Sequence, residues 1–366
     1  MTSSTLDDKT IVISGIGAMT SVGHQAPVAL TSIRAGISRL VSYPQYEPIV
    51  RDAAQYFPEP VITAPVTGIT NKIEGIERLL ALSVPSLRES LADAKLQDVD
   101  LQQVALLVAG GQRPDTKDNS RLATIFVDRL AARVCKSFFK KLQFLPMGHA
   151  GVFLALHQGI ELVREGICKH CVIGGVDSWL DIETLAWLDE DQRLKSESNV
   201  DGFIPGEASA FFVIERIQDA LTRGAKIYAK LGSVAIAQEQ FSHRSEQGCN
   251  GEALSQCVRT VIDEMSRTGM VLSAVLCDLN GESARAKEWG HCIPRVFDKD
   301  RPQPSVLLHS ADALGDVGAA SGSILVGLAA YAMGMGFVDW NTVMIWGSSD
   351  EKERAACSIS KWVSGQ

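Results

Sequence analysis

Short apolar runs alternate with amphipathic stretches along the first part of the chain. The run 104–111 is apolar at nearly every position, which predicts a strand buried on both faces, whereas 77–96 repeats its apolar residues at helical spacing. Glycine, proline and polar turns separate these segments. The pattern predicts strands at 10–17, 104–111, 142–146, 171–175 and 208–215, with helices at 77–96, 119–141 and 150–165.

The rest of the chain repeats this alternation. Strands alternating with helices twice over indicate an α/β fold made of two similar halves. We place the seam at 218–226 and divide the chain into an N-terminal half, 1–217, and a C-terminal half, 226–366. In the second half the pattern predicts strands at 227–237, 274–278, 306–309, 343–347 and 355–359, with helices at 252–267 and 319–333.

Composition limits the classes of function. The 366 residues are 46% hydrophobic and 21% charged, which is enough for a large core. The formal net charge of -8 provides no overall basic field for nucleic acid or an acidic membrane surface, so any attraction to an acidic partner must be local. Because no basic end followed by an apolar run opens the chain, we expect no secretory signal and a cytoplasmic protein.

Cysteine usage and the longest uncharged run exclude two further classes. The eight cysteines are spread irregularly, which indicates reduced thiols and not a disulfide framework. Cys168 and Cys171 form one local pair, but no second pair lies near it, so we predict no metal site. The uncharged run 317–338 is rich in small residues and is interpreted as a buried helix followed by a turn, not a membrane span.

The Gly15-Ile-Gly17 segment follows a predicted strand, as a dinucleotide-binding turn does. The third glycine of that fingerprint is missing, because Thr20 stands in its place. We therefore predict no cofactor and interpret the two glycines as a tight turn between strand and loop.

Four segments together resemble a known family. They are IVISGIGAMTSVG at 11–23, the helix at 77–96 with its RLLAL core, the Gly174-Gly175 strand end, and DGFIPGE at 201–207 followed by ASAFFVIER at 208–216. In this combination the chain resembles the β-ketoacyl synthases of the thiolase superfamily over nearly its whole length. The most specific block is 201–216, where a loop with Phe203 and Glu207 precedes a buried strand.

The resemblance implies a thiolase-like α/β fold with mixed sheets, two duplicated halves in an α-β-α-β-α five-layer arrangement, and a two-fold dimer. It also implies decarboxylative Claisen condensation of acyl chains carried on phosphopantetheine. That chemistry needs a cysteine at a helix N-terminus, where the dipole activates the thiol. Two histidines then stabilise the thioester enolate.

None of these three groups stands at the matching position. Counting back from two glycine anchors places the cysteine position on His149. The first histidine position falls on Asn280, and the second on Gly315 or Asp316, depending on register. The glycine-rich Phe gate of the family is replaced by Gly-Ser-Ser-Asp-Glu at 347–351.

His149 has two interpretations. It fills the former cysteine pocket as a structural side chain, hydrogen-bonded to backbone or to Asn280, or it acts as an acyl-accepting nucleophile. We favour the structural role, because an acyl-imidazole hydrolyses readily. Cys135 and Cys277 do not replace the thiol, since one is predicted inside a helix and the other inside a strand.

Two further groups of side chains are candidate binding residues. Glu282 and Glu288 flank Arg285 at i+3 spacing and are interpreted as an ion network or as a remodelled ligand pocket. The candidate ligand or partner pocket comprises His149, Phe203, Asn280, Glu282, Arg285, Asp312 and Asp316. A stripe of cations on one face of the helix 119–141 is either a solvated face or a surface for an acidic partner: Arg129, Arg133, Lys136 and Lys140.

Three hypotheses follow. The first is a non-catalytic dimeric accessory, adaptor or scaffold protein, similar to degenerate thiolase-like proteins of bacterial toxin-secretion clusters, with a secreted effector as partner. The second is a subunit that resembles a chain-length factor and pairs with an active ketosynthase homologue. The third is an acyltransferase, served by an acyl carrier protein, with chemistry around His149, Asp312 and Asp316.

Overall fold

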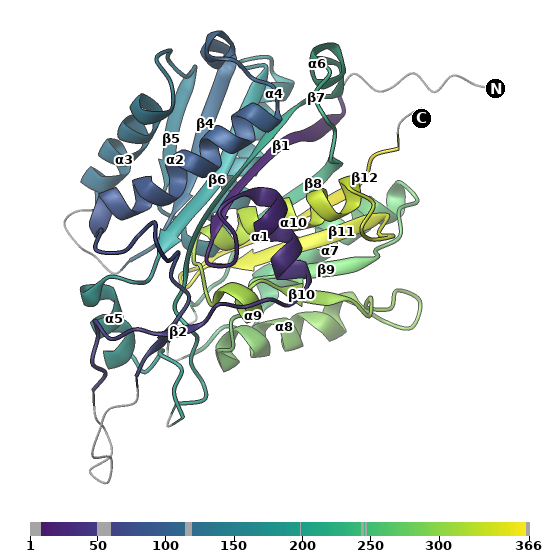
Figure 1. Cartoon of the computed structure of the whole chain (residues 1–366). Coiled ribbons are helices and arrows are strands. Elements are labelled where there is room, and N and C mark those ends of the chain that lie inside the picture. Colours follow the sequence, from purple (N-terminus) through teal and green to yellow (C-terminus); the bar gives the residue numbers. More distant parts are fainter. Residues whose placement is uncertain are drawn as a thin grey trace.

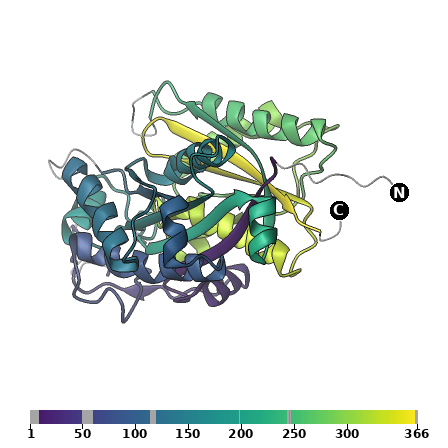
Figure 2. The same cartoon turned by 90° about the horizontal axis from the view of Figure 1, so that it is seen from above.

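The computed structural model describes residues 9–49, 60–113, 119–197, 199–242, 245 and 247–363. Figure 1 shows the N-terminal half, in purple to teal, beside the C-terminal half, in green to yellow. Seen from above in Figure 2, the helices of each half cover the sheet between them. The fold is mixed α/β, as predicted.

Five strands form the sheet of the N-terminal half, in the spatial order β5-β4-β6-β7-β1. β4 is parallel to both β5 and β6. β7 is antiparallel to both β6 and β1. The bounds are β1 Ile11–Thr20, β4 Val104–Gly110, β5 Lys141–Leu145, β6 His170–Ser178 and β7 Glu207–Arg216.

The C-terminal half repeats this arrangement in the order β10-β9-β11-β12-β8. When the strands of each half are numbered along the chain, both halves read 3-2-4-5-1, with the same parallel and antiparallel pairs. Two residue pairs between β1 and β8 join the halves into one ten-stranded sheet. The bounds are β8 Ala229–Gln238, β9 Ala274–Cys277, β10 Leu307–His309, β11 Thr342–Ser348 and β12 Glu353–Lys361. The division at 217 and 226 stays a prediction, and a short helix, α6 (Ile217–Arg223), occupies the proposed seam.

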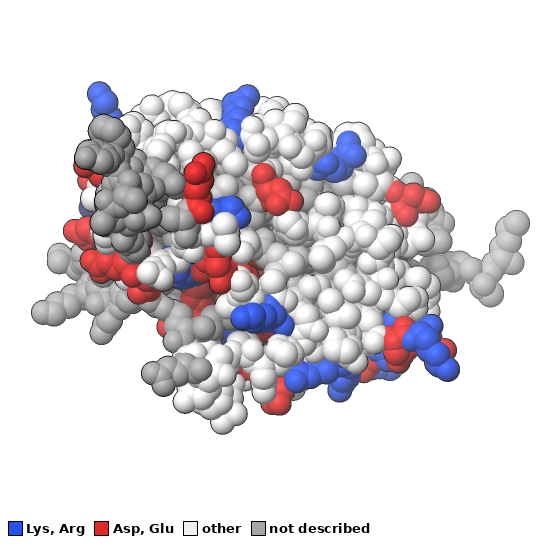
Figure 3. Space-filling model, turned by 90° about the horizontal axis from the view of Figure 1, so that it is seen from below, with Lys and Arg blue, Asp and Glu red and all other residues white. Residues whose placement is uncertain are grey.

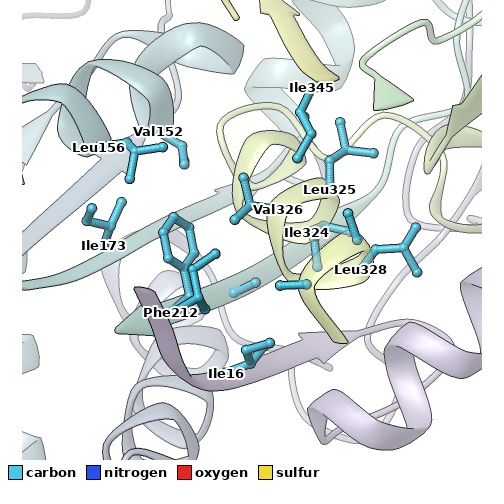
Figure 4. Close-up of a cluster of buried hydrophobic side chains, with 14 of the residues drawn as sticks. Ile16, Val152, Leu156, Ile173, Phe212, Ile324, Leu325, Val326, Leu328 and Ile345 are labelled. Carbon is cyan, nitrogen blue, oxygen red and sulfur yellow. The ribbon is translucent and has the colours of Figure 1, made fainter. Parts of the chain in front are cut away.

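Three hydrophobic cores separate the helices from the strands. The central core packs α4 (Gly151–Arg164) and α10 (Ala320–Gly334) between the strands of both halves. In Figure 4, Val326 of α10 lies between Phe212 of β7 and Ile345 of β11, and Val152 of α4 lies above Phe212. A second core lies under α2 (Gly75–Asp93) and α3 (Asn119–Val134), and a third under α7 (Glu252–Arg267) and α8 (Ser283–Val296). Helix, sheet, central helices, sheet and helix are therefore stacked in five layers.

The uncharged run at 317–338 forms α10, as predicted. Every residue from Ala320 to Met333 is buried, because sheets face this helix on opposite sides, so no polar stripe is required. Among the described residues, no helix combines the length and the apolar character needed to cross a membrane.

The remaining described elements are short. They are α1 Ala26–Arg34, α5 Ile182–Glu190, α9 Ala311–Leu314, the 3-10 turns η1 Asp98–Gln103 and η2 Gly148–Ala150, and the strands β2 Val41–Ser42 and β3 Ile62–Thr63.

The predicted cationic stripe on the helix 119–141 is wrong. α3 ends at Val134, so Lys136 and Lys140 lie beyond it. The helix stops because Asp98 binds the backbone N–H of Lys136 and the Ser137 hydroxyl, which turns the chain toward β5.

The two arginines of the stripe remain on α3. Arg129 and Arg133 both contact the carboxylate of Glu77 on α2, at 3.4 and 2.8 Å. Their charges are therefore partly used within the protein, and the four cations do not share one helix face.

The interpretation of Gly15 and Gly17 as a tight turn is also wrong. Both lie inside β1, where α2 crosses the strand. A Cβ at Gly17 would lie 2.0 Å from the Ser86 carbonyl oxygen, and one at Gly15 would lie 2.4 Å from that of Ser90. The glycines are needed for this close approach.

We predict that Gly17→Ala destabilises the protein by at least about 1–3 kcal/mol, because the added methyl group collides with helix backbone. Gly290→Ala is the matched control, since no atom lies within 4 Å of its Cβ position on α8. It should stabilise by up to about 1 kcal/mol through helix propensity. Thermal unfolding of both variants checks this, and equal melting temperatures would contradict it.

Candidate functional site

The head of α4 places His149 at the centre of the molecule. The chain leaves β5 at Leu145, turns at Gly148, whose φ is 58°, and enters α4 through η2. His149 is only 2% exposed. The backbone N–H of Ala150 donates to the Ser349 hydroxyl at 3.0 Å, and that hydroxyl donates to the Met147 carbonyl. Ser349, which follows β11, therefore accepts the hydrogen bond of one of the backbone N–H groups at the N-terminus of α4.

Asp316 is the direct partner of His149. The imidazole Nε2 lies 2.9 Å from Oδ1 and 3.1 Å from Oδ2 of the carboxylate. The same carboxylate accepts hydrogen bonds from the Asn280 amide at 2.6 Å, the Trp179 indole at 3.2 Å and the Gly318 backbone N–H at 2.7 Å. The three positions singled out in the sequence therefore meet. The expected partner of His149 was backbone or Asn280, whereas Asp316 stands between His149 and Asn280.

Arg285 lies on the other side of the imidazole. Its Nη2 is 3.2 Å from His149 Nδ1 and 2.8 Å from Asp350 Oδ1. Its Nη1 donates to Asp278 Oδ2 at 3.0 Å and to the Ser348 carbonyl. The Arg285 side chain is 1% exposed, so its contacts are made away from water.

A second guanidinium extends the network. Arg193 binds Glu282 at 2.7 Å and Asp350 at 2.8 Å, and the Asn280 amide also donates to Glu282 at 2.9 Å. Asp350 thus joins Arg193 to Arg285. The sequence reasoning missed Arg193 and Trp179, because nothing in their local pattern distinguishes them from ordinary loop residues, and it noted Asp350 only as part of the 347–351 segment.

The charges in this network shift one another's pKa values. Burial and the Arg285 guanidinium disfavour protonation of His149, but the Asp316 carboxylate outweighs them and raises the pKa of His149. Burial opposes ionisation of Asp316, yet His149 and Arg285 hold its pKa well below the usual range. Burial raises the pKa of Asp278 despite the adjacent Arg285.

The hydrogen bond at Nδ1 works against protonation of the imidazole. Nδ1 accepts from Arg285 only while the ring is neutral, with its hydrogen on Nε2 facing Asp316. The raised pKa of His149 still stands, because four carboxylates surround the two guanidiniums: Asp278, Glu282, Asp316 and Asp350. Their excess negative charge favours a proton on the ring.

Of the other predicted pocket residues, some lie at the network and others do not. Phe203 is fully buried beside the network, with its ring 5.1 Å from the Arg193 guanidinium. Glu282 lies 3.8 Å from Arg285, as expected, but Glu288 forms an ion pair with Arg354. The predicted ion network therefore contains Glu282 and Arg285, but its third predicted member, Glu288, is wrong.

Asp312 does not join the network. Its side chain is 77% exposed and lies 3.3 Å from His309. α9 places it on the surface, whereas the chain turns at Gly315, whose φ is 64°, and the Asp316 N–H then donates to the Ile204 carbonyl at 2.7 Å.

Neither Cys135 nor Cys277 lies at the head of α4. Cys277 is buried inside β9, as predicted, and burial raises its pKa. Cys135 lies just beyond α3 and not inside a helix, and burial raises its pKa too. Burial likewise raises the pKa values of Cys168 and Cys171, so both thiols are protonated at neutral pH.

One set of possible metal ligands occurs among the described residues, away from His149: Glu239, Cys249 and Glu288. Arg354 already neutralises Glu288 there. Burial and Glu288 raise the pKa of the Cys249 thiol to about 12, which disfavours the thiolate that a metal requires. We therefore assign no metal to this cluster.

Comparisons with known proteins identify the type of fold. No family model matches the chain. A Schizosaccharomyces pombe protein named as a mitochondrial 3-oxoacyl-(acyl-carrier-protein) synthase is 23% identical, over 86% of this chain and 84% of its own. The ketoacyl synthase alpha subunit of tetracenomycin polyketide synthase from Streptomyces glaucescens is 29% identical over 45% of this chain and 42% of its own.

Solved structures agree. The ishigamide ketosynthase/chain length factor has a TM-score of 0.74 and 16% identity, over 97% of this chain and 99% of its own. A type II polyketide ketosynthase in complex with its acyl-carrier protein has a TM-score of 0.76 and 14% identity, with the same coverage. The relatives and structural neighbours are thus ketosynthase proteins with the thiolase-like fold, which confirms the predicted resemblance and fold class.

We predict a pH-dependent contribution of His149 to stability. Because its folded-state pKa is raised, the stabilisation is complete below the unfolded pKa of about 6.5 and is lost as pH rises through the folded value. The difference in unfolding free energy between wild type and His149→Gln should therefore be larger near pH 6 than near pH 8. Denaturant titrations at both pH values measure it, and a constant difference would exclude the effect.

Arg285→Met should destabilise the protein by about 3–5 kcal/mol, because it leaves Asp278 buried without its cation and removes one of the two cations that pair with Asp350. Arg267→Met is the control, since Arg267 pairs with Glu264 on the surface and should contribute less than about 1 kcal/mol. Urea unfolding compares the two variants, and similar midpoints would contradict the role of Arg285.

Proposed function

We propose that this chain is a ketosynthase-like protein without condensing activity, which serves as a dimeric accessory, adaptor or scaffold protein. One observation carries the proposal. Both ring nitrogens of His149, at the head of α4, are engaged by Asp316 and Arg285, and the imidazole is 3% exposed. A side chain held in this way supports the structure and does not attack a thioester.

The charge at Asp316 supports the same conclusion. Decarboxylative condensation passes through a thioester enolate, whose negative charge requires hydrogen-bond donors or cations. Asp316 is a buried anion, and His149, Arg285 and the Asn280 amide hold it ionised despite its burial. A carboxylate beside an enolate raises the energy of that intermediate, so the network opposes the step that the family's two histidines assist.

The head of α4 gives a third line of support. In the β-ketoacyl synthases that the chain resembles, the N-terminus of a helix activates the cysteine. Here the Ala150 N–H already donates to the Ser349 hydroxyl, and the N-terminus of α4 lies against the network of charged side chains. We therefore regard this region as a structural core that joins the two halves.

A second candidate function is a chain-length-factor-like subunit that pairs with an active ketosynthase. The similarity to a structure titled as a ketosynthase/chain length factor, over 97% of this chain, favours it. Under this proposal the partner is a ketosynthase homologue. Under the first proposal the chain forms a homodimer in the cytoplasm. This dimer binds an unrelated protein, such as a secreted effector of a bacterial toxin-secretion system. An acyltransferase centred on His149 and Asp312 is disfavoured, because Asp312 faces solvent.

We predict that the purified protein neither decarboxylates malonyl-acyl-carrier thioesters nor becomes acylated on incubation with acyl-carrier thioesters. His149→Cys should not restore condensation, because Asn280 and Asp316 still stand where the histidines are needed. Intact-protein mass spectrometry and a carbon dioxide release assay measure both steps. Steady turnover by wild type that is lost in His149→Ala would refute the proposal.

Affinity capture from native extract separates the two candidate functions. Recovery of a cysteine-containing ketosynthase supports the chain-length-factor role, whereas recovery of an unrelated protein supports the adaptor role. Light scattering on the purified chain tests the proposed homodimer.

A further inference from the structure

One end of the N-terminal half exposes apolar side chains between lysines. It is the end at which the parallel strands β4, β5 and β6 begin, at the top of Figure 1 and facing the viewer in Figure 2. Each of the three loops that lead into these strands presents one apolar side chain: Val99 is 73% exposed, Phe138 84% and Ile167 48%. We call this surface the strand-start face; it comprises Val99, Lys136, Phe138, Lys140, Lys141, Ile167 and Lys169.

Backbone contacts fix these loops against one another. The Lys140 N–H donates to the carbonyls of Leu101 and Val104, at 3.2 and 2.8 Å. The Lys169 N–H donates to the Gln103 carbonyl at 2.9 Å. Asp98 holds the loop before β5 through two hydrogen bonds. Phe138 and Val99 are thus held outward by a rigid frame, at the cost of exposing apolar surface to water.

On the strand-start face lysines outnumber carboxylates, whereas in the whole protein acidic residues outnumber basic ones. Its four lysines are exposed, and across the described ranges none forms an ion pair with a carboxylate: Lys136, Lys140, Lys141 and Lys169. Three carboxylates lie in the same loops, Asp98, Asp100 and Glu165, and the first two accept hydrogen bonds from loop residues. The whole chain carries a formal charge of -8, and on the opposite end, seen in Figure 3, basic and acidic side chains are interspersed.

We propose that the strand-start face binds the surface of an anionic lipid bilayer, with Phe138 inserted at the level of the headgroups and the lysines on the lipid phosphates. Protein–protein interfaces are depleted in lysine and bury a contiguous apolar core. Here single apolar side chains lie on separate loops, and the most exposed of them, Phe138, lies between Lys136 and the Lys140-Lys141 pair, which suits a fluid anionic surface better than a protein partner. Lysine stems lie along apolar surface while their charged ends stay in water.

Co-sedimentation with vesicles tests this proposal. We expect the wild-type protein to bind vesicles of phosphatidylcholine mixed with phosphatidylglycerol, to bind phosphatidylcholine alone much less, and to dissociate at high salt, because the attraction falls off within a Debye length. Lys140→Gln and Lys141→Gln should each weaken binding about fivefold. Phe138→Ser should weaken it about tenfold through lost apolar burial.

Two control variants match these substitutions on other surfaces. Val200→Ser changes a side chain that is 74% exposed beside Asp201, and Lys287→Gln changes an exposed lysine on α8. Both should bind like wild type. The proposal is overturned if the wild-type protein does not bind anionic vesicles, or if the control variants lose as much binding as the lysine and phenylalanine variants. It is also overturned if Phe138→Ser changes the mass of the protein in solution, because the face would then mediate contacts between copies. Circular dichroism verifies that every variant is folded.

Discussion

The buried carboxylate of Asp316 is the interaction on which the centre of the molecule depends. An ion removed from water costs several kcal/mol unless its lone pairs and charge are matched. His149 and Trp179 come from the N-terminal half, whereas Asn280 and the Gly318 N–H come from the C-terminal half. The carboxylate is therefore satisfied only when the two halves are docked, and the heads of α4 and α10 are fixed against each other.

Much of the fold was predictable because its strands are buried on both faces. A run such as β4 is apolar at every position, and the sharply amphipathic α7 has the bounds that its periodicity predicts. The end of α3 was not predictable, since helical spacing continues to Lys140 and only Asp98, 38 residues earlier, diverts the chain. The glycines of β1 were misinterpreted for a similar reason: their role is set by α2, which packs across them.

Some residues of the candidate site were also predictable from the sequence, and others were not. Position counting within the resemblance brought His149, Asn280 and Asp316 to attention, and the structure places them in direct contact. Arg193 and Asp350 lie on loops with no periodic pattern, and their ion pair joins positions 157 residues apart. A contact of that kind is fixed by tertiary docking, which local sequence does not encode.

The members of this network are interdependent. Arg285 neutralises Asp278 and Asp350, while its Nη2 approaches His149. Removal of any one partner leaves a charge buried without compensation, which is more costly than replacement of the whole set by apolar residues. A carboxylate at 316 therefore requires the imidazole at 149 and the amide at 280, and it holds one ring nitrogen of His149 while Arg285 holds the other.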